Sequence, residues 1–230
     1  MKLQRLTTAT ITLLCAGCAG PQSALSPAGV EAERIASLFW WMTAGAGIVW
    51  IGVMMLALFA AKERGRGERS RGGRWIIVGG AATPAVVLAV LLLFGLAMLP
   101  DLLAVPPKDT MRIHVTAEQW WWRFRYEIPG RIPFETANEL RLPVGEPVEF
   151  LLHSTNVIHS FWIPSLGGKM DAIPGRVNRL VLHPTMTGTF LGTCAEYCGV
   201  GHGKMAMQAI VVPKDAFAPW VDTMQGAVRP

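Results

Sequence analysis

Charged residues, cysteine and histidine are all scarce in this chain of 230 residues. Asp, Glu, Lys and Arg together make up 16% of it, against 51% hydrophobic residues, and the mean hydropathy is +0.35. This composition indicates membrane segments, and we expect no nucleic acid partner. The four cysteines and five histidines form no Cys-x-x-Cys-His motif, which excludes a covalently attached c-type haem. The chain also has no internal repeat, which excludes a repeat architecture.

Two long runs contain no charged residue. Residues 38–61 form an uncharged run of 24 residues, and residues 75–99 form another of 25. As α-helices they would be roughly 36–38 Å long, which is enough to cross a bilayer with some tilt. Pro84 lies inside the second run, and proline is tolerated in membrane helices, where it commonly produces a kink. We therefore predict a two-helix transmembrane hairpin over residues 37–100.

The short connector between the two runs, residues 62–74, is strongly basic. It has only two acidic residues, Glu63 and Glu68, against Lys62, Arg64, Arg66, Arg69, Arg71 and Arg74. A basic run is usually a solvated face, but between two membrane spans it marks the cytoplasmic side. We therefore predict that this loop is cytoplasmic and that the C-terminal part, residues 101–230, is extracytoplasmic.

The N-terminus has the features of a secretion signal. Lys2 and Arg5 precede a short apolar stretch, residues 6–14, that is too brief to span a membrane. The sequence Leu-Cys-Ala-Gly-Cys that follows resembles a bacterial lipoprotein signal, with Cys18 as the lipidated first residue after cleavage. We predict a signal peptide with a lipobox over residues 1–18 and an extracytoplasmic tether over residues 19–36. The alternative is ordinary cleavage nearby, which leaves Cys18 as an exposed thiol or removes it.

The C-terminal 130 residues contain short β-branched or aromatic-rich runs bounded by glycine and proline, a pattern typical of strands. The runs cover residues 112–126, 139–142, 147–153, 179–183, 190–193 and 206–212, and a helix is expected only around residues 216–224. Such a set fits an antiparallel sandwich or barrel closed by Greek-key connections. We therefore predict an α+β membrane protein in which the helical hairpin precedes a β-barrel.

The metal-binding chemistry is concentrated in the segment Cys194-Ala-Glu-Tyr-Cys198-Gly-Val-Gly-His202-Gly-Lys-Met205, with His159 lying upstream. Soft sulfur ligands hold Cu(I), and imidazole suits either oxidation state, so this combination favours copper. A mononuclear blue-copper site needs only one cysteine. The second cysteine leaves enough ligands for two ions that share both thiolates. We therefore predict a binuclear copper centre that transfers electrons.

Each copper would have one imidazole, the two shared sulfurs and one weak axial ligand. Met205 is the axial ligand expected for one ion, and the main-chain carbonyl of Glu196 is the one expected for the other. The alternatives are a disulfide between Cys194 and Cys198, a zinc site or chance clustering. A disulfide does not explain His202 and Met205, and structural zinc usually takes only Cys and His.

Together with a second segment, the cysteine motif resembles subunit II of the haem–copper cytochrome c oxidases. The second segment is Asn156-Val-Ile-His-Ser-Phe-Trp-Ile-Pro-Ser-Leu-Gly-Gly-Lys-Met-Asp171-Ala-Ile-Pro-Gly-Arg176. The resemblance implies a CuA centre on a cupredoxin-like barrel. This centre would take electrons from cytochrome c and pass them to haem in subunit I. It also implies a magnesium ion shared with subunit I and bound by the Glu196 side chain.

The same resemblance implies the setting of the chain. The whole complex would reduce dioxygen to water and pump protons. Its subunit II would be a multi-pass protein of the bacterial inner membrane, with its C-terminal domain in the periplasm.

The sequence Gln119-Trp120-Trp121-Trp122 is a further feature. In a strand, Trp120 and Trp122 would lie on one face and Trp121 on the other. Such tryptophans are usually core or interface residues. The family resemblance instead implies that Trp120 is the residue at which the electron from cytochrome c enters.

For the remaining histidines and for one charged pair, we predict structural roles. We expect His114, His153 and His183 to be hydrogen-bonded barrel residues rather than ligands. Asp171 and Arg176 are expected to form a structural salt bridge. The resemblance alternatively implies a place in the proton or water exit region that faces subunit I.

The chain departs from the family pattern in two places. The family usually has an acidic residue where Asn156 stands, three residues before His159. Many members also carry a carboxylate near the cytoplasmic start of the second span, associated with proton uptake into subunit I. Here no acidic residue lies between Arg69 and Pro100, and Glu68 is the nearest. Proton delivery by that route therefore lacks its usual carboxylate.

Three other functions compete with this interpretation. A quinol oxidase subunit II resembles the fold but lacks the paired cysteines and histidines. A membrane-anchored copper-delivery or copper-storage protein would not need the tryptophan cluster or the barrel. A nitrous oxide reductase fragment shares the copper motif but should not have two membrane spans.

The predicted outer domain is formally neutral, because residues 101–230 contain twelve acidic and twelve Lys or Arg residues. Long-range steering of a charged partner needs a surface of opposite charge and weakens with salt. We therefore expect association with the donor to depend weakly on ionic strength and more on apolar contact around Trp120.

Overall fold

The computed structural model describes residues 19–62, 73–74, 76–103, 106–107 and 109–228. The predicted signal peptide with Cys18, and most of the basic connector including Glu68, lie outside the described residues. The chain divides into two compact units. One combines the residues up to Trp40 with those from Pro106 onward, and the other consists of the residues between them.

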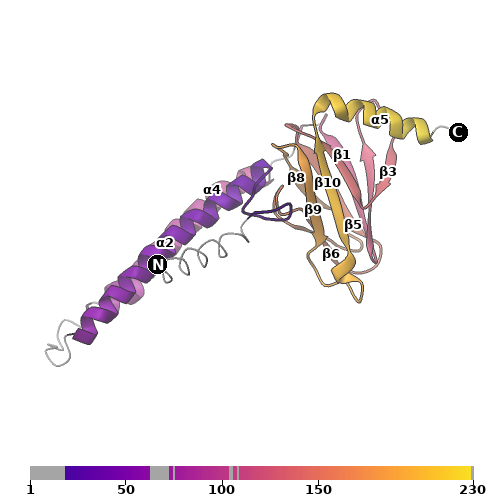
Figure 1. The fold of residues 1–230 in the computed structure, drawn as a ribbon. Coiled ribbons are helices and arrows are strands. Elements are labelled where there is room, and N and C mark those ends of the chain that lie inside the picture. The colour runs from indigo at the N-terminus through magenta and orange to yellow at the C-terminus, as the bar shows by residue number, and fades with distance from the viewer. Residues whose placement is uncertain (1–18, 63–72, 75, 104–105, 108, 229–230) are drawn as a thin grey trace, which may run out of the picture. The chain divides into compact units, whose positions relative to one another are not determined.

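The two uncharged runs form long helices (Figure 1). Helix α2 spans Val30–Lys62, and the second run forms a π-helical turn, Val78–Ala82, that continues into α4, Thr83–Leu103. Both runs are long and apolar enough to cross a membrane. The π-turn ends at Ala82, two residues before Pro84, which has no N–H to donate within the helix. Val78 O accepts hydrogen bonds from both the main-chain N–H of Thr83 and its Oγ1–H, the latter at 2.8 Å. The structure therefore has a widened turn next to Pro84, and the kink predicted there stays a prediction.

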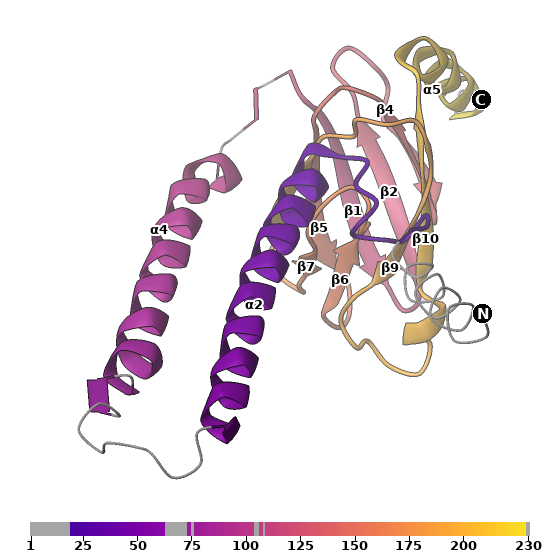
Figure 2. The ribbon, with the colours of Figure 1, turned by 60° about the vertical axis from the view of Figure 1, so that its left-hand side comes forward.

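The C-terminal unit is a sandwich of two five-stranded sheets (Figure 2). The strand order is β3-β2-β1-β5-β8 in one sheet and β4-β10-β9-β6-β7 in the other. The strands are β1 Met111–Glu118, β2 Trp121–Glu127, β3 Phe134–Ala137, β4 Glu139–Pro143, β5 Val148–Ser154, β6 His159–Trp162, β7 Met170–Ala172, β8 Asn178–Leu182, β9 Gly188–Cys194 and β10 Ala206–Val212. Together with the two apolar helices, this sandwich confirms the predicted fold class.

Two strand pairs differ from the purely antiparallel arrangement predicted. Strand β1 runs parallel to β5, and β4 runs parallel to β10, while the other pairs are antiparallel. In both pairs the two strands are separated by other elements along the chain, so no tight hairpin forces them to be antiparallel. These crossovers produce sheets of mixed direction within the predicted sandwich.

The predicted strand over residues 112–126 is in fact two strands with a tight turn between them. Residues Gln119 and Trp120 form this turn, so Trp120 is not part of β2. The expectation that Trp120 and Trp122 share a strand face is therefore wrong. Trp122 is fully buried in the core, whereas Trp120 is 37% exposed. Strands β3, β6 and β7 were not predicted, because each has only three or four residues and too little pattern to recognise.

Aromatic side chains fill the space between the two sheets. Alternate residues of β2 point inward, so that Trp122, Phe124 and Tyr126 are all fully buried. Phe161 of β6 packs edge-on against Trp122, with ring centroids 5.6 Å apart. Helix α5, Lys214–Val228, includes the helix expected at residues 216–224, and its Trp220 packs against Tyr126 at 5.3 Å. Burial of side chains of this size provides much of the stability of such a domain.

Residues 21–29, here called the N-terminal strap, are bound to the sandwich instead of forming a free tether. The main-chain N–H of Leu191 donates to Pro21 O at 2.9 Å, and Ala28 N–H donates to Ser165 O at 2.7 Å. Ala28 is buried in the same hydrophobic cluster as the sheets. The strap therefore holds the start of α2 against the C-terminal domain through main-chain hydrogen bonds. The sequence did not predict this attachment, because the small residues of the strap show no pattern that indicates it.

The strap leads to a prediction at Gly29. A Cβ atom at this position would lie 2.5 Å from the main-chain oxygen of Leu166, which cannot move away as a flexible side chain can. We expect Gly29→Ala to destabilise the C-terminal unit by about 1–3 kcal/mol and to expose the strap to proteases. Thermal unfolding and limited proteolysis of the detergent-solubilised chain measure both effects. Gly226→Ala is the control, because open space surrounds that position in α5, and unchanged stability of Gly29→Ala would contradict the prediction.

Candidate metal centre

The ligand motif occupies the loop between β9 and β10. These two strands pair antiparallel, and at their ends the Cys194 N–H donates to Met205 O at 3.0 Å. The loop therefore begins and ends at the same place, with both terminal residues of the motif facing one another. Strand β6 pairs with the other side of β9, with Phe161 opposite Cys194, and this pairing places His159 next to the loop.

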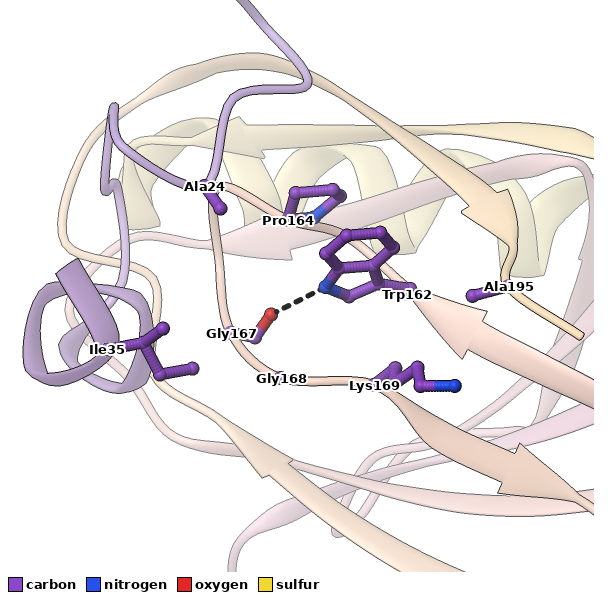
Figure 3. A pocket seen from close by; sticks show the side chains of 8 residues that line it. All are labelled: Ala24, Ile35, Trp162, Pro164, Gly167, Gly168, Lys169 and Ala195. Carbon is purple, nitrogen blue, oxygen red and sulfur yellow. Dashed lines mark hydrogen bonds between the residues drawn. The ribbon is translucent and has the colours of Figure 1, made fainter. Parts of the chain in front are cut away.

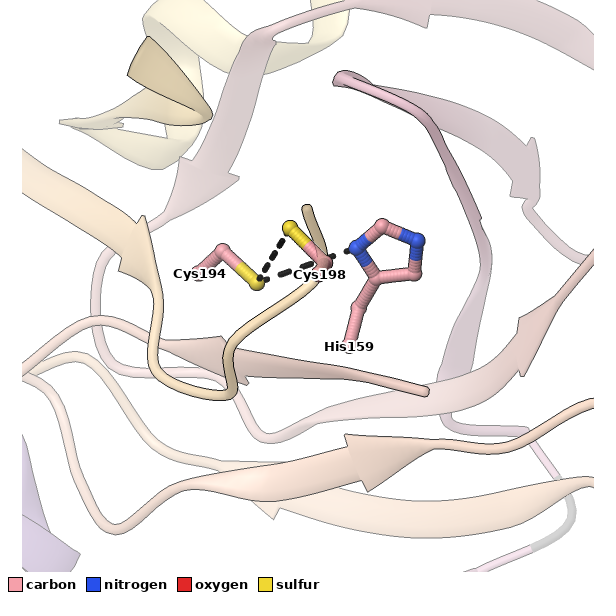
Figure 4. Close-up of side chains that lie close together, drawn as sticks. All are labelled: His159, Cys194 and Cys198. Carbon is pink, nitrogen blue, oxygen red and sulfur yellow. Dashed lines mark hydrogen bonds between the residues drawn. The ribbon is translucent and has the colours of Figure 1, made fainter. Parts of the chain in front are cut away.

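The donor atoms of the predicted ligands lie close together, and Figure 4 shows three of these residues, His159, Cys194 and Cys198. The two thiol sulfurs are 3.8 Å apart. His159 Nδ1 lies 3.7 Å from Cys194 Sγ, and His202 Nδ1 lies 3.6 Å from Cys198 Sγ. Glu196 O is 3.2 Å from Cys194 Sγ. Met205 Sδ, which completes the set, is 3.9 Å from Cys198 Sγ.

These separations fit ligands that share metal ions. Thiolate and imidazole ligands lie about 2.0–2.3 Å from a metal, so neighbouring ligands of one tetrahedral ion are ~3.3–3.8 Å apart. Each sulfur also has its own imidazole and its own axial candidate. The disulfide alternative does not occur in the structure, because both thiols are free and their sulfurs are far beyond the ~2.05 Å of a disulfide bond.

The candidate centre is largely removed from solvent. His159 is fully buried, and the two cysteines and Met205 are at most 3% exposed. Burial, together with the neighbouring Cys194 sulfur, raises the pKa of the Cys198 thiol to about 11. Burial also lowers the pKa of His159, and His202 adds to this effect. At neutral pH the metal-free site therefore contains a protonated thiol and a neutral imidazole, and a metal must displace the thiol proton.

Asn156 sets the tautomer of His159. The Asn156 Oδ1 atom accepts a hydrogen bond from the Val157 N–H at 2.8 Å, which identifies this atom as the oxygen. His159 Nε2 lies 3.1 Å from the same oxygen, so Nε2 carries the proton and donates it. The Nδ1 atom, which faces Cys194, then keeps its lone pair. The amide thus leaves the ligand nitrogen free, as second-shell acceptors of metal-bound histidines generally do.

The remaining predicted residues lie around the sulfur cluster. His202 lies in a short 3-10 turn, His202–Lys204, and is half-buried. The Glu196 side chain is exposed, while its carbonyl points toward Cys194. Trp120 reaches the loop from the β1–β2 turn, and its Nε1–H donates to Cys198 O at 3.1 Å.

Gln119 is a residue near the centre that sequence reasoning missed. Its Nε2–H donates to Cys198 O at 2.8 Å, although the two residues are 79 positions apart. The only signal in the sequence was its place directly before Trp120. That position alone does not indicate which part of the chain its amide contacts.

Two other predictions concern contacts outside the candidate centre. One of these contacts is present and structural, and the other is absent from the described residues. His114 Nε2 lies 2.9 Å from Glu127 Oε2 on the exposed side of the sheet, and this hydrogen bond lowers the pKa of Glu127. The expected salt bridge between Asp171 and Arg176 is not found among the contacts of the described residues. Arg176 is exposed, and the Asp171 contact is instead a main-chain one, from Asn178 Nδ2 to Asp171 O at 2.8 Å.

A separate pocket of about 340 Å³ lies beside the ligand loop (Figure 3). It is lined by Ala24, Ile35, Trp162, Pro164, Gly167, Gly168, Lys169 and Ala195. The indole N–H of Trp162 already donates to Gly167 O at 3.1 Å. Because Lys169 is the one charged residue of this lining, the pocket is unsuited to a second metal cation.

Comparison with known proteins agrees with this geometry. The family model described as "Cytochrome C oxidase subunit II, periplasmic domain" matches residues 129–213. The chain is 33% identical over 235 aligned positions to cytochrome c oxidase subunit 2 of Alkalihalophilus pseudofirmus, and the match covers 95% of this chain and 67% of the relative. This chain belongs to the cytochrome c oxidase subunit 2 family. The predicted resemblance is thereby confirmed.

Two further similarities have narrower coverage. Cytochrome c oxidase subunit 2 of Bacillus sp. (strain PS3) is 41% identical over 129 positions, which cover 54% of this chain and 35% of the relative. The crystal structure of the periplasmic domain of subunit II of the cytochrome oxidase of Bradyrhizobium japonicum is 33% identical. The match covers 54% of this chain and 99% of the Bradyrhizobium japonicum domain, with a TM-score of 0.49.

Family membership makes this chain a subunit of an oxidase complex. The buried cluster of His159, Cys194 and Cys198 is its candidate copper site, since these three donor atoms lie within 4.8 Å of one another. The two apolar helices and the match to a periplasmic domain together indicate a membrane anchor followed by a periplasmic domain.

The contact between Asn156 and His159 gives a prediction for the metal-free protein. We expect wild-type His159 to be mainly the Nε2–H tautomer, and Asn156→Leu to give a mixture because the acceptor is lost. Nitrogen chemical shifts of the chain labelled at histidine report the tautomer directly. Asn178→Leu is the control, because Asn178 donates to Asp171 O and not to a histidine. An unchanged His159 signal in Asn156→Leu would contradict the assignment.

Proposed function

We propose that this chain is the subunit at which electrons enter a proton-translocating terminal oxidase. It accepts electrons from cytochrome c at a binuclear CuA centre and passes them to haem in subunit I, where the complex reduces dioxygen to water. Its partners are then subunit I and other oxidase subunits, cytochrome c and membrane lipid. The observation that carries the proposal is the paired arrangement of donor atoms, in which each of two neighbouring sulfurs has its own imidazole and axial candidate.

The proposed copper ligands are His159, Cys194, Cys198, His202 and Met205, with Glu196 contributing its main-chain carbonyl. Two copper ions held by these residues would supply one-electron transfer. The protein contributes a buried site whose ligands are already close together before metal binds. Preorganised ligands on paired strands need little movement, which suits rapid electron transfer.

Trp120 is the proposed point of electron uptake from cytochrome c. Its indole is partly exposed on the surface, and the same ring donates a hydrogen bond to the carbonyl of the ligand residue Cys198. Trp120 thus gives a short covalent and hydrogen-bonded connection between solvent and the sulfur cluster. The two candidate ligand segments also carry exposed apolar side chains, namely Ile158 next to His159, and Tyr197 and Val200 in the loop that contains Cys198.

Magnesium is the second proposed metal, bound by the Glu196 side chain at the boundary with subunit I. Carboxylate oxygens are typical magnesium ligands, and magnesium usually takes only one or two of them from a given protein. The exposed Glu196 carboxylate is available for an ion outside the sulfur cluster, while its carbonyl faces Cys194. One residue would then contact both metals.

The proposed setting is the bacterial inner membrane. We propose residues 1–18 as a signal peptide with lipidation at Cys18, residues 37–100 as the transmembrane hairpin and residues 101–230 as the periplasmic CuA domain. Residues 19–36 connect the first two parts outside the cytoplasm. The basic loop 62–74 supports this orientation, because positive charge is retained on the cytoplasmic side. A membrane-anchored copper-delivery protein is the alternative, but the buried set of candidate ligands is poorly suited to releasing copper.

The first test is electron paramagnetic resonance of the full-length chain loaded with copper in detergent. Because two thiolates let two ions share one unpaired electron, we expect a purple oxidised form with hyperfine structure from two equivalent copper nuclei. Cys198→Ser should reduce the stoichiometry to at most one copper. Met205→Leu should retain copper and shift its reduction potential, because axial ligands tune a site more than they hold it.

The matched control for the methionine is Met207→Leu. Met207 is also buried, at 2% exposure, but belongs to β10 and not to the ligand loop. This variant should leave the spectrum and the potential unchanged. A blue, single-copper signal from the wild-type chain would overturn the binuclear assignment.

The second test concerns association with the donor. The domain is formally neutral, and Glu118, the carboxylate nearest to Trp120 in sequence, already forms an ion pair with Arg123. We therefore expect turnover of the purified oxidase to change by less than about threefold across a salt series, whereas steered association falls tenfold or more. Trp120→Phe should slow electron uptake at every salt concentration. A steep loss of rate with salt would refute the weak-steering hypothesis.

A further inference from the structure

Two side-chain donors converge on one main-chain oxygen of the ligand loop. Gln119 Nε2 and Trp120 Nε1 donate to Cys198 O at 2.8 and 3.1 Å. A carbonyl oxygen has two lone pairs, so it accepts both bonds at once. The donors belong to the β1–β2 turn of one sheet, whereas the acceptor belongs to the loop between β9 and β10 of the other sheet.

The indole of Trp120 also packs directly on the loop. A Cβ atom at Gly201 would lie 2.3 Å from Trp120 Cδ2 and 2.5 Å from Cγ. Gly201 has φ −92° and ψ 4°, a conformation that other residues also adopt. The backbone therefore does not require glycine at this position. Glycine is needed there because a Cβ atom would overlap the Trp120 ring.

The bonds within the loop do not by themselves attach it to the neighbouring sheet. His202 N–H donates to Gly199 O at 3.0 Å, and Lys204 N–H donates to Gly201 O at 2.9 Å. Both bonds stay within the half of the loop that follows Cys198. At the other end, Ala195 N–H donates to Ser160 O at 2.9 Å. The contacts of the β1–β2 turn therefore fix the middle of the loop, where Cys198 lies.

We propose that Gln119 is a positioning residue for the ligand Cys198, and that Trp120 shares this role in addition to electron uptake. Together they form a clamp, defined as the two hydrogen bonds to Cys198 O and the contact between the Trp120 ring and Gly201. The clamp holds the Cys198 backbone in place before metal binds. The importance of this position for electron transfer rests on the proposed function, but the clamp itself acts on the metal-free loop.

The first measurement is hydrogen exchange of the loop amides in the metal-free, full-length chain in detergent. We expect Gln119→Met, which keeps the length of the side chain but removes the donor, to accelerate exchange at residues 199–204 by about tenfold. Gln119→Glu should do the same, because its carboxylate has the shape of the amide but only acceptor oxygens. Gln208→Met, at an exposed glutamine of β10, should have no effect. Wild-type exchange in both Gln119 variants would overturn the proposal.

Two glycines of the same loop provide an independent comparison. Gly201→Ala should displace the Trp120 ring and accelerate exchange, whereas Gly203→Ala should not, since nothing lies within 4 Å of its Cβ position. Should Gly201→Ala fail to fold, the Gln119 variants still decide the question. Equal exchange in folded Gly201→Ala and Gly203→Ala would count against the clamp.

The second measurement uses copper alone as the probe. We expect Gln119→Met to release copper to a chelator about tenfold faster than wild type, a loss typical of removing a second-shell contact. Unchanged release would show that the clamp does not position the ligand. If the copper spectrum proves to be that of a single ion, the proposed function fails. The exchange results on the metal-free loop still test the clamp in that case.

Discussion

The antiparallel pairing of β9 with β10 is the interaction on which the candidate metal centre depends. It closes the loop so that Cys194 and Met205 meet through a main-chain hydrogen bond, although eleven positions separate them. Closing a loop costs conformational entropy, and here the sheet hydrogen bonds offset that cost before any metal is present. The pairing of β6 with β9 then adds His159 to the same place. Ligands from two segments therefore converge because of backbone pairing and not because of the metal.

Burial of the ligands links protonation to metal binding. A thiolate is costly to place in an apolar environment, which explains why the Cys198 thiol is protonated at neutral pH in the metal-free protein. The His159 imidazole is kept neutral by the same burial, and Asn156 fixes which nitrogen carries its proton. The protein thus prepares the His159 nitrogen for metal binding, while the Cys198 sulfur still has to lose its proton.

The two sheets contribute differently to the centre. The sheet that contains β9 and β10 supplies the candidate ligands, whereas the sheet that contains β1 and β2 supplies their surroundings. From β2, the buried Trp122 ring packs 6.2 Å from the His159 ring, and the turn before it contacts Cys198 O. The centre therefore lies at the end of the sandwich where both sheets meet, and its geometry depends on their packing.

The amino-acid sequence by itself indicated the candidate copper ligands and determined the class of the fold. Cys194, Cys198, His202 and Met205 are close in sequence, so chain connectivity restricts them to one loop, and their donor types indicate copper. The uncharged runs likewise predict helices from length and composition alone. Tertiary structure decided the contacts between distant segments. These include the attachment of the N-terminal strap, the parallel strand pairs, and the reach of Gln119 to a carbonyl 79 residues away. Such contacts depend on how strands pair and pack, and no local pattern of residues records that choice.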